Sequence, residues 1–236
     1  MSHRLEPGAF DAVLFDAGGI LVLPDPTVIA PLLAPYGGTD DLDAHRRAHY
    51  AGMAAKSRAG ASEMDWSSYN VAYVETVGVE VVLVERAAEM LDRTRSADLW
   101  RWPIPESVAA LQRLSGLGVP MSVVSNASGQ IEWVLAHMGI CQVGSGRGVA
   151  MRAVIDSHVV GVAKPDPRIF DFALVEHSEH DRSRILYVGD SVLMDVNGAR
   201  AAGLHPVLLD PHGDHPDLDA DRIDDLSALA HLFSAV

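Results

Sequence analysis

The chain has 236 residues, which is enough for one core domain with a sizeable insertion or for two small domains. Its formal net charge of −14 argues against nucleic acid or an anionic membrane surface as a partner, because both would repel it. The single cysteine, Cys141, excludes an internal disulfide and favours a reducing compartment.

Short apolar runs alternate with helix-like segments along most of the chain. We predict strands at residues 12–15, 119–124, 185–188 and 207–209. Helices are predicted at residues 105–117, 129–138, 167–175 and 191–202. Strands that alternate with helices in this way are typical of parallel βαβ units, so the fold class is α/β.

Residues 24–99 follow a different pattern. Four prolines interrupt the first part of this stretch, and alanine-rich amphipathic sequence follows, as at 42–55 and 81–91. No strand–helix alternation is present there. We therefore expect a helical domain at 24–99, inserted into a core formed by 1–23 and 100–236. Residues 212–225 are acidic and predict a loop before a short C-terminal helix.

Polar side chains follow several predicted strands directly. Asp16 comes after the first strand, Ser125 and Asn126 after the second, and Asp190 after the third. Because the carboxyl ends of parallel strands meet at one edge of a sheet, we expect these side chains to lie close together.

Carboxylates that meet at such an edge repel one another unless a cation lies among them. Asp16 and Asp190, with Asp195 shortly after, supply oxygen ligands, and these favour Mg²⁺. The hydroxyl, amide and ammonium groups of Ser125, Asn126 and Lys164 suit the oxygens of a phosphate.

These segments, in this order, resemble the four motifs of the haloacid dehalogenase (HAD) superfamily, and the resemblance covers essentially the whole chain. The strongest match is Gly189-Asp190-Ser191 with Asp195, continued by residues 197–203. The resemblance implies a Rossmann-like parallel-sheet core. The insertion at 24–99 fits the subtype that carries a helical cap after the first strand.

The resemblance also implies roles for the matched acidic residues. Asp16 would be the nucleophile and would form an aspartyl-phosphate. Mg²⁺ would be held by Asp16, Asp190 and the backbone carbonyl of Gly18, with Asp195 as a ligand or as a group behind the ligands.

The remaining matched residues would bind the substrate. Ser125 and Asn126 would contact the phosphoryl group, and Lys164 would offset the charge on Asp16 and on the phosphate. Lys56 is the only other lysine of the chain and falls in the expected cap, so it is a further candidate for substrate contact.

Position 18 departs from the pattern of the family. Most of its phosphatases have Asp two residues after the nucleophile, where it protonates the leaving oxygen and later activates water. Gly18 has no side chain to do either.

Several interpretations of Gly18 are open. The chain is a phosphatase in which water, another group or the substrate supplies the proton, which suits a leaving group of low pKa. Alternatively it is a dehalogenase, which needs no leaving-group acid, although those relatives usually have Tyr at this position. A phosphonate C–P hydrolase would use a cap lysine as a Schiff base, but the residues around Lys56 lack the expected motif. A non-catalytic binding protein is the contrasting class.

We therefore expect a Mg²⁺-dependent hydrolase, foremost a phosphatase of a small phosphorylated metabolite. The N-terminal residues show no signal-peptide pattern, and the apolar runs are far shorter than the roughly 20 residues that span a bilayer. These features predict a soluble, cytoplasmic protein.

Overall fold

The computed structural model describes residues 5–233. In it the chain divides into two compact units, each described separately below. The core unit comprises residues up to 21, residues 103–211 and residues from 217 onward, and the helical unit comprises residues 22–102 and 212–216.

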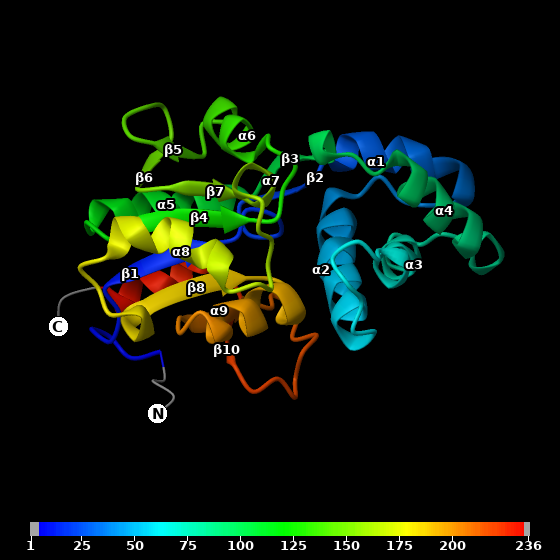
Figure 1. Cartoon of the computed structure of the whole chain (residues 1–236). Helices are drawn as coiled ribbons and strands as arrows, with labels where there is room; N and C mark the ends of the chain where they lie inside the picture. Colours follow the sequence, from blue (N-terminus) through cyan, green and yellow to red (C-terminus); the bar gives the residue numbers. More distant parts are fainter. Residues whose placement is uncertain (1–4, 234–236) are drawn as a thin grey trace. The chain divides into compact units, whose positions relative to one another are not determined.

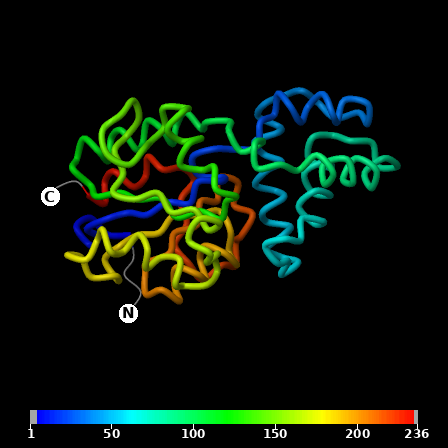
Figure 2. Tube along the Cα trace, turned by 45° about the horizontal axis from the view of Figure 1, so that its top comes forward, coloured from blue at the N-terminus to red at the C-terminus, as the bar shows by residue number. Residues whose placement is uncertain are grey.

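The core unit is built on a six-stranded parallel sheet with the strand order β10–β9–β8–β1–β4–β7. The strands are β1 (Ala12–Phe15), β4 (Met121–Ser125), β7 (Val154–Asp156), β8 (Ile185–Gly189), β9 (His205–Leu209) and β10 (Asp221–Ile223). Figure 2 shows the blue trace of β1 running through the middle of the unit, consistent with its pairing with β8 and β4. The predicted α/β class with a parallel, Rossmann-like sheet is confirmed.

Helices cover both faces of this sheet (Figure 1). They are α5 (Pro105–Gly116), α6 (Ile131–His137), α7 (Ser157–Val160), α8 (Arg168–Leu174) and α9 (Asn197–Ala201), with a π-helical turn at Val192–Val196 and a 3₁₀ helix at Leu226–Leu232. On one face, Leu14 and Tyr187 pack with Phe170 of α8 and Ala199 of α9. A second, small parallel sheet pairs β5 (Cys141–Val143) with β6 (Val149–Met151).

The prediction of a loop over residues 212–225 was wrong at its end. Asp221–Ile223 forms β10, which pairs in parallel with β9 so that Ile223 lies opposite Leu209. Ile223 is the only apolar residue of this three-residue strand, so the sequence has no apolar run to indicate it. Strand β7 was not predicted either, because its three residues are too few to form a recognisable apolar run.

The helical unit contains α1 (Pro26–Leu33), α2 (Leu42–Arg58), α3 (Ser67–Thr76) and α4 (Val84–Thr94). Strands β2 (Val22–Pro24) and β3 (Trp100–Pro103) pair where the chain passes between the two units. Helix α1 forms in spite of the prolines that were expected to interrupt this stretch. Pro26 occupies the first turn, where its missing N–H has no intrahelical partner, and Asp25 caps the helix by accepting from Thr27 N at 3.0 Å.

Buried aromatic and imidazole side chains hold α2 against α3. His45 Nδ1 lies 2.8 Å from the hydroxyl of Tyr73, and His49 Nδ1 lies 3.0 Å from that of Tyr69. Gly52 allows the close approach, because a Cβ there would stand 2.5 Å from the Tyr69 ring. Across residues 5–233, every helix is too short or too polar to cross a lipid bilayer.

Candidate active site

The carboxyl ends of β1, β4 and β8 bring Asp16, Ser125 and Asp190 to one edge of the sheet. Phe15 pairs with Val188 on one side and with Val123 on the other. Asp16 follows directly, and its backbone N–H donates to the Val188 carbonyl at 2.8 Å. This pairing places Asp16 beside the chain that leads from β8 into Asp190.

Three carboxylates converge at this edge. Side-chain oxygens of Asp16, Asp190 and Asp195 all lie within 4.8 Å of one another. Asp190 and Asp195 are buried, whereas the side chain of Asp16 keeps 13% of its surface exposed. Within the described part of the chain, this is the cluster of potential metal ligands that the structure contains.

Lys164 lies among these carboxylates. Its Nζ is 2.9 Å from Asp16 Oδ1 and 2.7 Å from Asp195 Oδ1, and its side chain is only 1% exposed. Burial acts to lower the pKa of Lys164, but the charges of Asp16 and Asp195 outweigh it, so the net shift is upward and the ammonium stays charged.

The same charges act on Asp16. Burial raises the pKa of the Asp16 carboxyl, and Asp195 and Asp190 add to that effect, whereas Lys164 opposes it; the net shift is upward. A cation bound among the carboxylates would act in the opposite direction and favour the ionised form. The oxygens of Asp16 are also unequal, because Oδ1 accepts from Lys164 and from Ala17 N at 2.7 Å. No hydrogen bond to Asp16 Oδ2 comes from residues 5–233, so this oxygen has free lone pairs.

Tyr187 is a member of the cluster that the sequence did not reveal. Its hydroxyl accepts from Lys164 Nζ at 2.9 Å and lies 2.9 Å from the Val124 carbonyl and 3.1 Å from Asp195 Oδ1. The residue is fully buried, and its ring packs edge-on against Phe170. The hydroxyl therefore gives Lys164 a third contact beside Asp16 and Asp195 and ties it to strand β4.

The backbone after β8 is shaped to place Asp195. The N–H of Ser191 donates to Asp195 Oδ2 at 2.9 Å. Gly189 permits this approach, since a Cβ at that position would lie 2.2 Å from Asp195 Cγ. With Lys164, Tyr187 and Ser191 all bound to it, Asp195 is held rigidly in one orientation.

Asn126 fixes the backbone of Lys164 from the other side. Its Nδ2 donates to the Lys164 carbonyl at 3.0 Å, and its Oδ1 accepts from the Lys164 N–H at 2.8 Å. Ser125, the last residue of β4, is buried beside it, and its hydroxyl has no hydrogen-bond partner within residues 5–233. The structure thus brings Ser125, Asn126 and Lys164 to the edge where Asp16 emerges.

Gly18 and Lys56 complete the predicted set. Gly18 is half-buried two residues after Asp16. Lys56 belongs to the helical unit and is buried, not solvated. Its Nζ donates to the Glu63 carbonyl at 2.7 Å and stands 3.7 Å from the centre of the Trp66 ring.

Comparison with known proteins gives concordant results. The family model for haloacid dehalogenase-like hydrolases matches residues 10–203. The chain is 32% identical over 110 residues to the pyrimidine 5'-nucleotidase YjjG of Escherichia coli, covering 47% of this chain and 46% of that protein. It is 36% identical over 102 residues to the (S)-2-haloacid dehalogenase H-109 of Pseudomonas putida, covering 43% of this chain and 42% of that protein.

The chain thus matches less than half the length of these curated relatives. A solved structure, that of a HAD phosphatase from Thermococcus onnurineus, superposes with a TM-score of 0.56 over 93% of this chain and 96% of the other. At 22% identity, this likeness shows a shared fold.

Proposed function

The chain belongs to the haloacid dehalogenase-like hydrolase family, and from this premise we propose that it is a Mg²⁺-dependent phosphatase of a small phosphorylated metabolite that forms an aspartyl-phosphate on Asp16. The observation that carries the proposal is the convergence of three carboxylates and one buried lysine at the carboxyl edge of the sheet. Phosphatases are among the relatives of the chain, as the pyrimidine 5'-nucleotidase illustrates.

The charges and donor atoms of this cluster suit a divalent cation. Three carboxylates and one ammonium leave a net charge of −2, and all the ligand atoms are hard oxygens. Asp16, Asp190 and the Gly18 carbonyl are the proposed ligands, with Asp195 behind them because its two oxygens already accept from Lys164 Nζ and from Ser191 N. When bound, Mg²⁺ would neutralise charge on the carboxylates and on the phosphoryl oxygens.

The residues of the chain divide the chemistry among them. Asp16 Oδ2, with its free lone pairs, attacks phosphorus as the bond between phosphorus and the leaving-group oxygen breaks, while Lys164 holds Oδ1 and so keeps the carboxylate in one orientation. Water then cleaves the aspartyl-phosphate, which releases inorganic phosphate and restores Asp16. The hydroxyl of Ser125 donates a hydrogen bond to the phosphoryl group. The side chain of Asn126 serves mainly to position Lys164, since both its amide atoms bind the lysine backbone.

The leaving group must depart without an acid at position 18. Loss of a general acid costs roughly 10²–10⁴-fold in rate for a poor leaving group. Acyl phosphates and anomeric sugar phosphates have leaving groups of low pKa and are therefore the proposed substrate class.

Residues 24–99 act, in this proposal, as the substrate-selecting cap of the family. The ammonium of Lys56 already donates to the Glu63 carbonyl. A carbonyl oxygen and the face of an indole both favour the charged ammonium, which is the unreactive form for a Schiff base. This environment argues against phosphonate hydrolysis through Lys56.

The test is hydrolysis of acetyl phosphate and p-nitrophenyl phosphate, with Mg²⁺ and with EDTA, by the wild type, Asp16→Asn and Asp166→Asn. Asp166 lies close to Lys164 in sequence, but its carboxylate pairs with Arg168 at the surface, so this variant controls for a lost charge. We expect Mg²⁺-dependent turnover that Asp16→Asn abolishes and Asp166→Asn keeps. Equal turnover by the wild type and Asp16→Asn would refute the proposal.

A dehalogenase is the second candidate. It is favoured by the (S)-2-haloacid dehalogenase among the relatives and by Gly18, since displacement of a halide needs no acid. Release of chloride from 2-chloropropionate in the presence of EDTA, again abolished by Asp16→Asn, would select this function over the phosphatase.

A further inference from the structure

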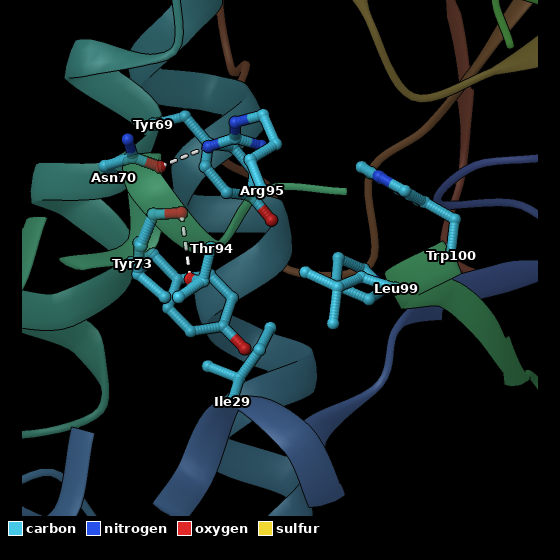
Figure 3. Close-up of a pocket in the computed structure, with 10 residues that line it drawn as sticks. Ile29, Tyr69, Asn70, Tyr73, Thr94, Arg95, Leu99 and Trp100 are labelled. Atoms are coloured by element: carbon cyan, nitrogen blue, oxygen red, sulfur yellow. Dashed lines mark hydrogen bonds between the residues drawn. The ribbon is translucent and has the colours of Figure 1, made fainter. Parts of the chain in front are cut away.

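A small pocket lies inside the helical unit. It is bounded by α1, α3, α4 and the return of the chain into β3, and the residues that shape it include Ile29, Tyr69, Asn70, Leu91, Arg95 and Trp100 (Figure 3). The centres of water-sized groups have about 20 Å³ of space in it, which is enough for a small ligand group. All of these residues belong to the helical unit, whereas the Asp16 cluster belongs to the core unit.

Arg95 gives the pocket its charge. Its Nη2 donates to Asn70 Oδ1, yet its Nε is buried and has no acceptor within residues 5–233. No carboxylate in the described part of the chain forms an ion pair with it; Asp92 is reached only indirectly, through the Asn70 amide at 3.3 Å. A buried donor without an acceptor is destabilising by about 1–3 kcal/mol. A ligand that accepts a hydrogen bond from Nε would remove this cost.

Trp66 stabilises this cation without using its donors. The centre of the indole ring lies 4.1 Å from Arg95 Cζ and 3.7 Å from Lys56 Nζ, so two cations share one aromatic ring. A ring face attracts the charge but accepts no in-plane hydrogen bond, so the Nε–H of Arg95 is not satisfied by Trp66. In a chain with a net charge of −14, this is an unusual concentration of positive charge.

The other polar groups of the pocket are already paired. The Tyr69 hydroxyl bonds to His49, and both amide atoms of Asn70 are used by Arg95 and Asp92. The walls are otherwise apolar, with Ile29 and Leu91 prominent. Figure 3 shows the guanidinium of Arg95 turned toward Asn70, with Leu99 and Trp100 on the other side of the pocket. The pocket therefore has an excess of donors over acceptors in an apolar setting.

We propose that this pocket binds the carboxylate group of a small organic acid, with Arg95 as its principal ligand. A planar guanidinium matches the two oxygens of a planar carboxylate. The largely apolar walls suit a singly charged carboxylate with a short hydrocarbon chain better than the more highly charged and more strongly hydrated phosphate.

Titration with sodium acetate at constant ionic strength tests this site, with calorimetry for the affinity and the indole N–H signals of Trp66 and Trp100 in ¹H–¹⁵N spectra for the location. We expect saturable binding that moves these signals, whereas sodium chloride and sodium phosphate at the same ionic strength do not. Arg95→Gln should weaken acetate binding at least tenfold. Arg93→Gln removes the same charge from an exposed neighbour that pairs with Glu89, and should leave the affinity unchanged.

Unchanged acetate binding by Arg95→Gln, an equal response to chloride, or tighter binding of phosphate would each overturn the assignment. If thermal unfolding shows that Arg95→Gln does not fold, Arg95→Lys keeps the charge but loses the planar fork. Acetate should then bind at least fivefold more weakly than to the wild type, and equal affinity would refute the proposal. None of these measurements requires turnover, so their outcome does not depend on whether the chain is a phosphatase.

Discussion

Replacing Tyr187 with Phe isolates the hydroxyl that ties Lys164 to the sheet. The hydroxyl lies 2.9 Å from Lys164 Nζ, 2.9 Å from the Val124 carbonyl and 3.1 Å from Asp195 Oδ1. Phe keeps the edge-on contact with Phe170 at 4.9 Å between ring centres, so packing is preserved. What remains is a buried ammonium with one unsatisfied N–H. We therefore expect the free energy of unfolding to fall by about 1–3 kcal/mol.

The same substitution should reduce catalysis. Lys164 stays bound to Asp16 and Asp195 but loses the contact that fixes its third N–H. If the poorer orientation of Lys164 raises the free energy of the transition state by about 1.4 kcal/mol, kcat falls about tenfold. KM should change little, because the hydroxyl acts through Lys164. The assay is steady-state hydrolysis of acetyl phosphate with Mg²⁺, combined with urea unfolding.

Ser122→Ala is the matched control for Tyr187→Phe. It also deletes one fully buried hydroxyl of the sheet, on β4, where the hydroxyl bonds His177 Nε2 at 2.8 Å and Ala153 N at 3.1 Å. We expect a similar loss of stability with unchanged kcat. A wild-type kcat in Tyr187→Phe, or equal losses of kcat in both variants, would show that the hydroxyl does not position Lys164.

Three further substitutions test the charges and the packing of the core unit. Lys164→Met leaves buried carboxylates uncompensated and should lower the free energy of unfolding by about 3–5 kcal/mol. Because the charge of the cluster becomes −3, Mg²⁺ should raise the melting temperature of the variant more than that of the wild type. Equal shifts of the melting temperature would contradict a cation site here. Burial, with the nearby charge of Arg152, lowers the pKa of His177 from 6.5 to about 4, so the unfolded chain binds a proton first and stability falls as the pH drops from 6.5 toward 4. His177→Gln should remove about 3 kcal/mol of that acid sensitivity in urea unfolding at pH 7 and pH 4, and an unchanged pH dependence would refute the assignment. Gly189→Ala places a Cβ 2.2 Å from Asp195 Cγ and should cost about 1–3 kcal/mol of stability and most of the activity. Gly116→Ala, which has open space around it, should change neither. Unchanged stability and activity in both variants would show that Asp195 can move.

The sheet and its reactive edge were predictable because their signals are local. An apolar run that ends in a carboxylate, as at Asp16 and Asp190, indicates both a buried strand and the edge at which it ends. The parallel topology then follows from the alternation of strands and helices, and it brings Asp16, Asp190 and Lys164 together whatever the intervening sequence. Strands β7 and β10 lack such a signal, because each has only three residues and takes its place from its neighbour.

Tyr187 was not predicted as a site residue because its ring packs in the core, whereas its hydroxyl contacts Lys164. Its ring lies in an apolar strand and reads as an ordinary core aromatic, which it also is. The signal that was present is its alternation with Leu186 and Val188, which puts the hydroxyl on one face of β8 two residues before Gly189. Only the position of Lys164, 23 residues away in sequence, shows that a cation meets that hydroxyl.

The helical unit was less predictable for a related reason. Its prolines indicated interruption, but Pro26 lies in the first turn of α1, where a proline is accommodated without loss of a hydrogen bond. Its central contact, Trp66 between Lys56 and Arg95, joins three segments that no periodic pattern connects. A pairing of this kind leaves only isolated aromatic and charged residues in the sequence. The contacts of Arg95 in the helical unit therefore had to come from the three-dimensional structure, because no sequence pattern links it to Trp66 and Asn70.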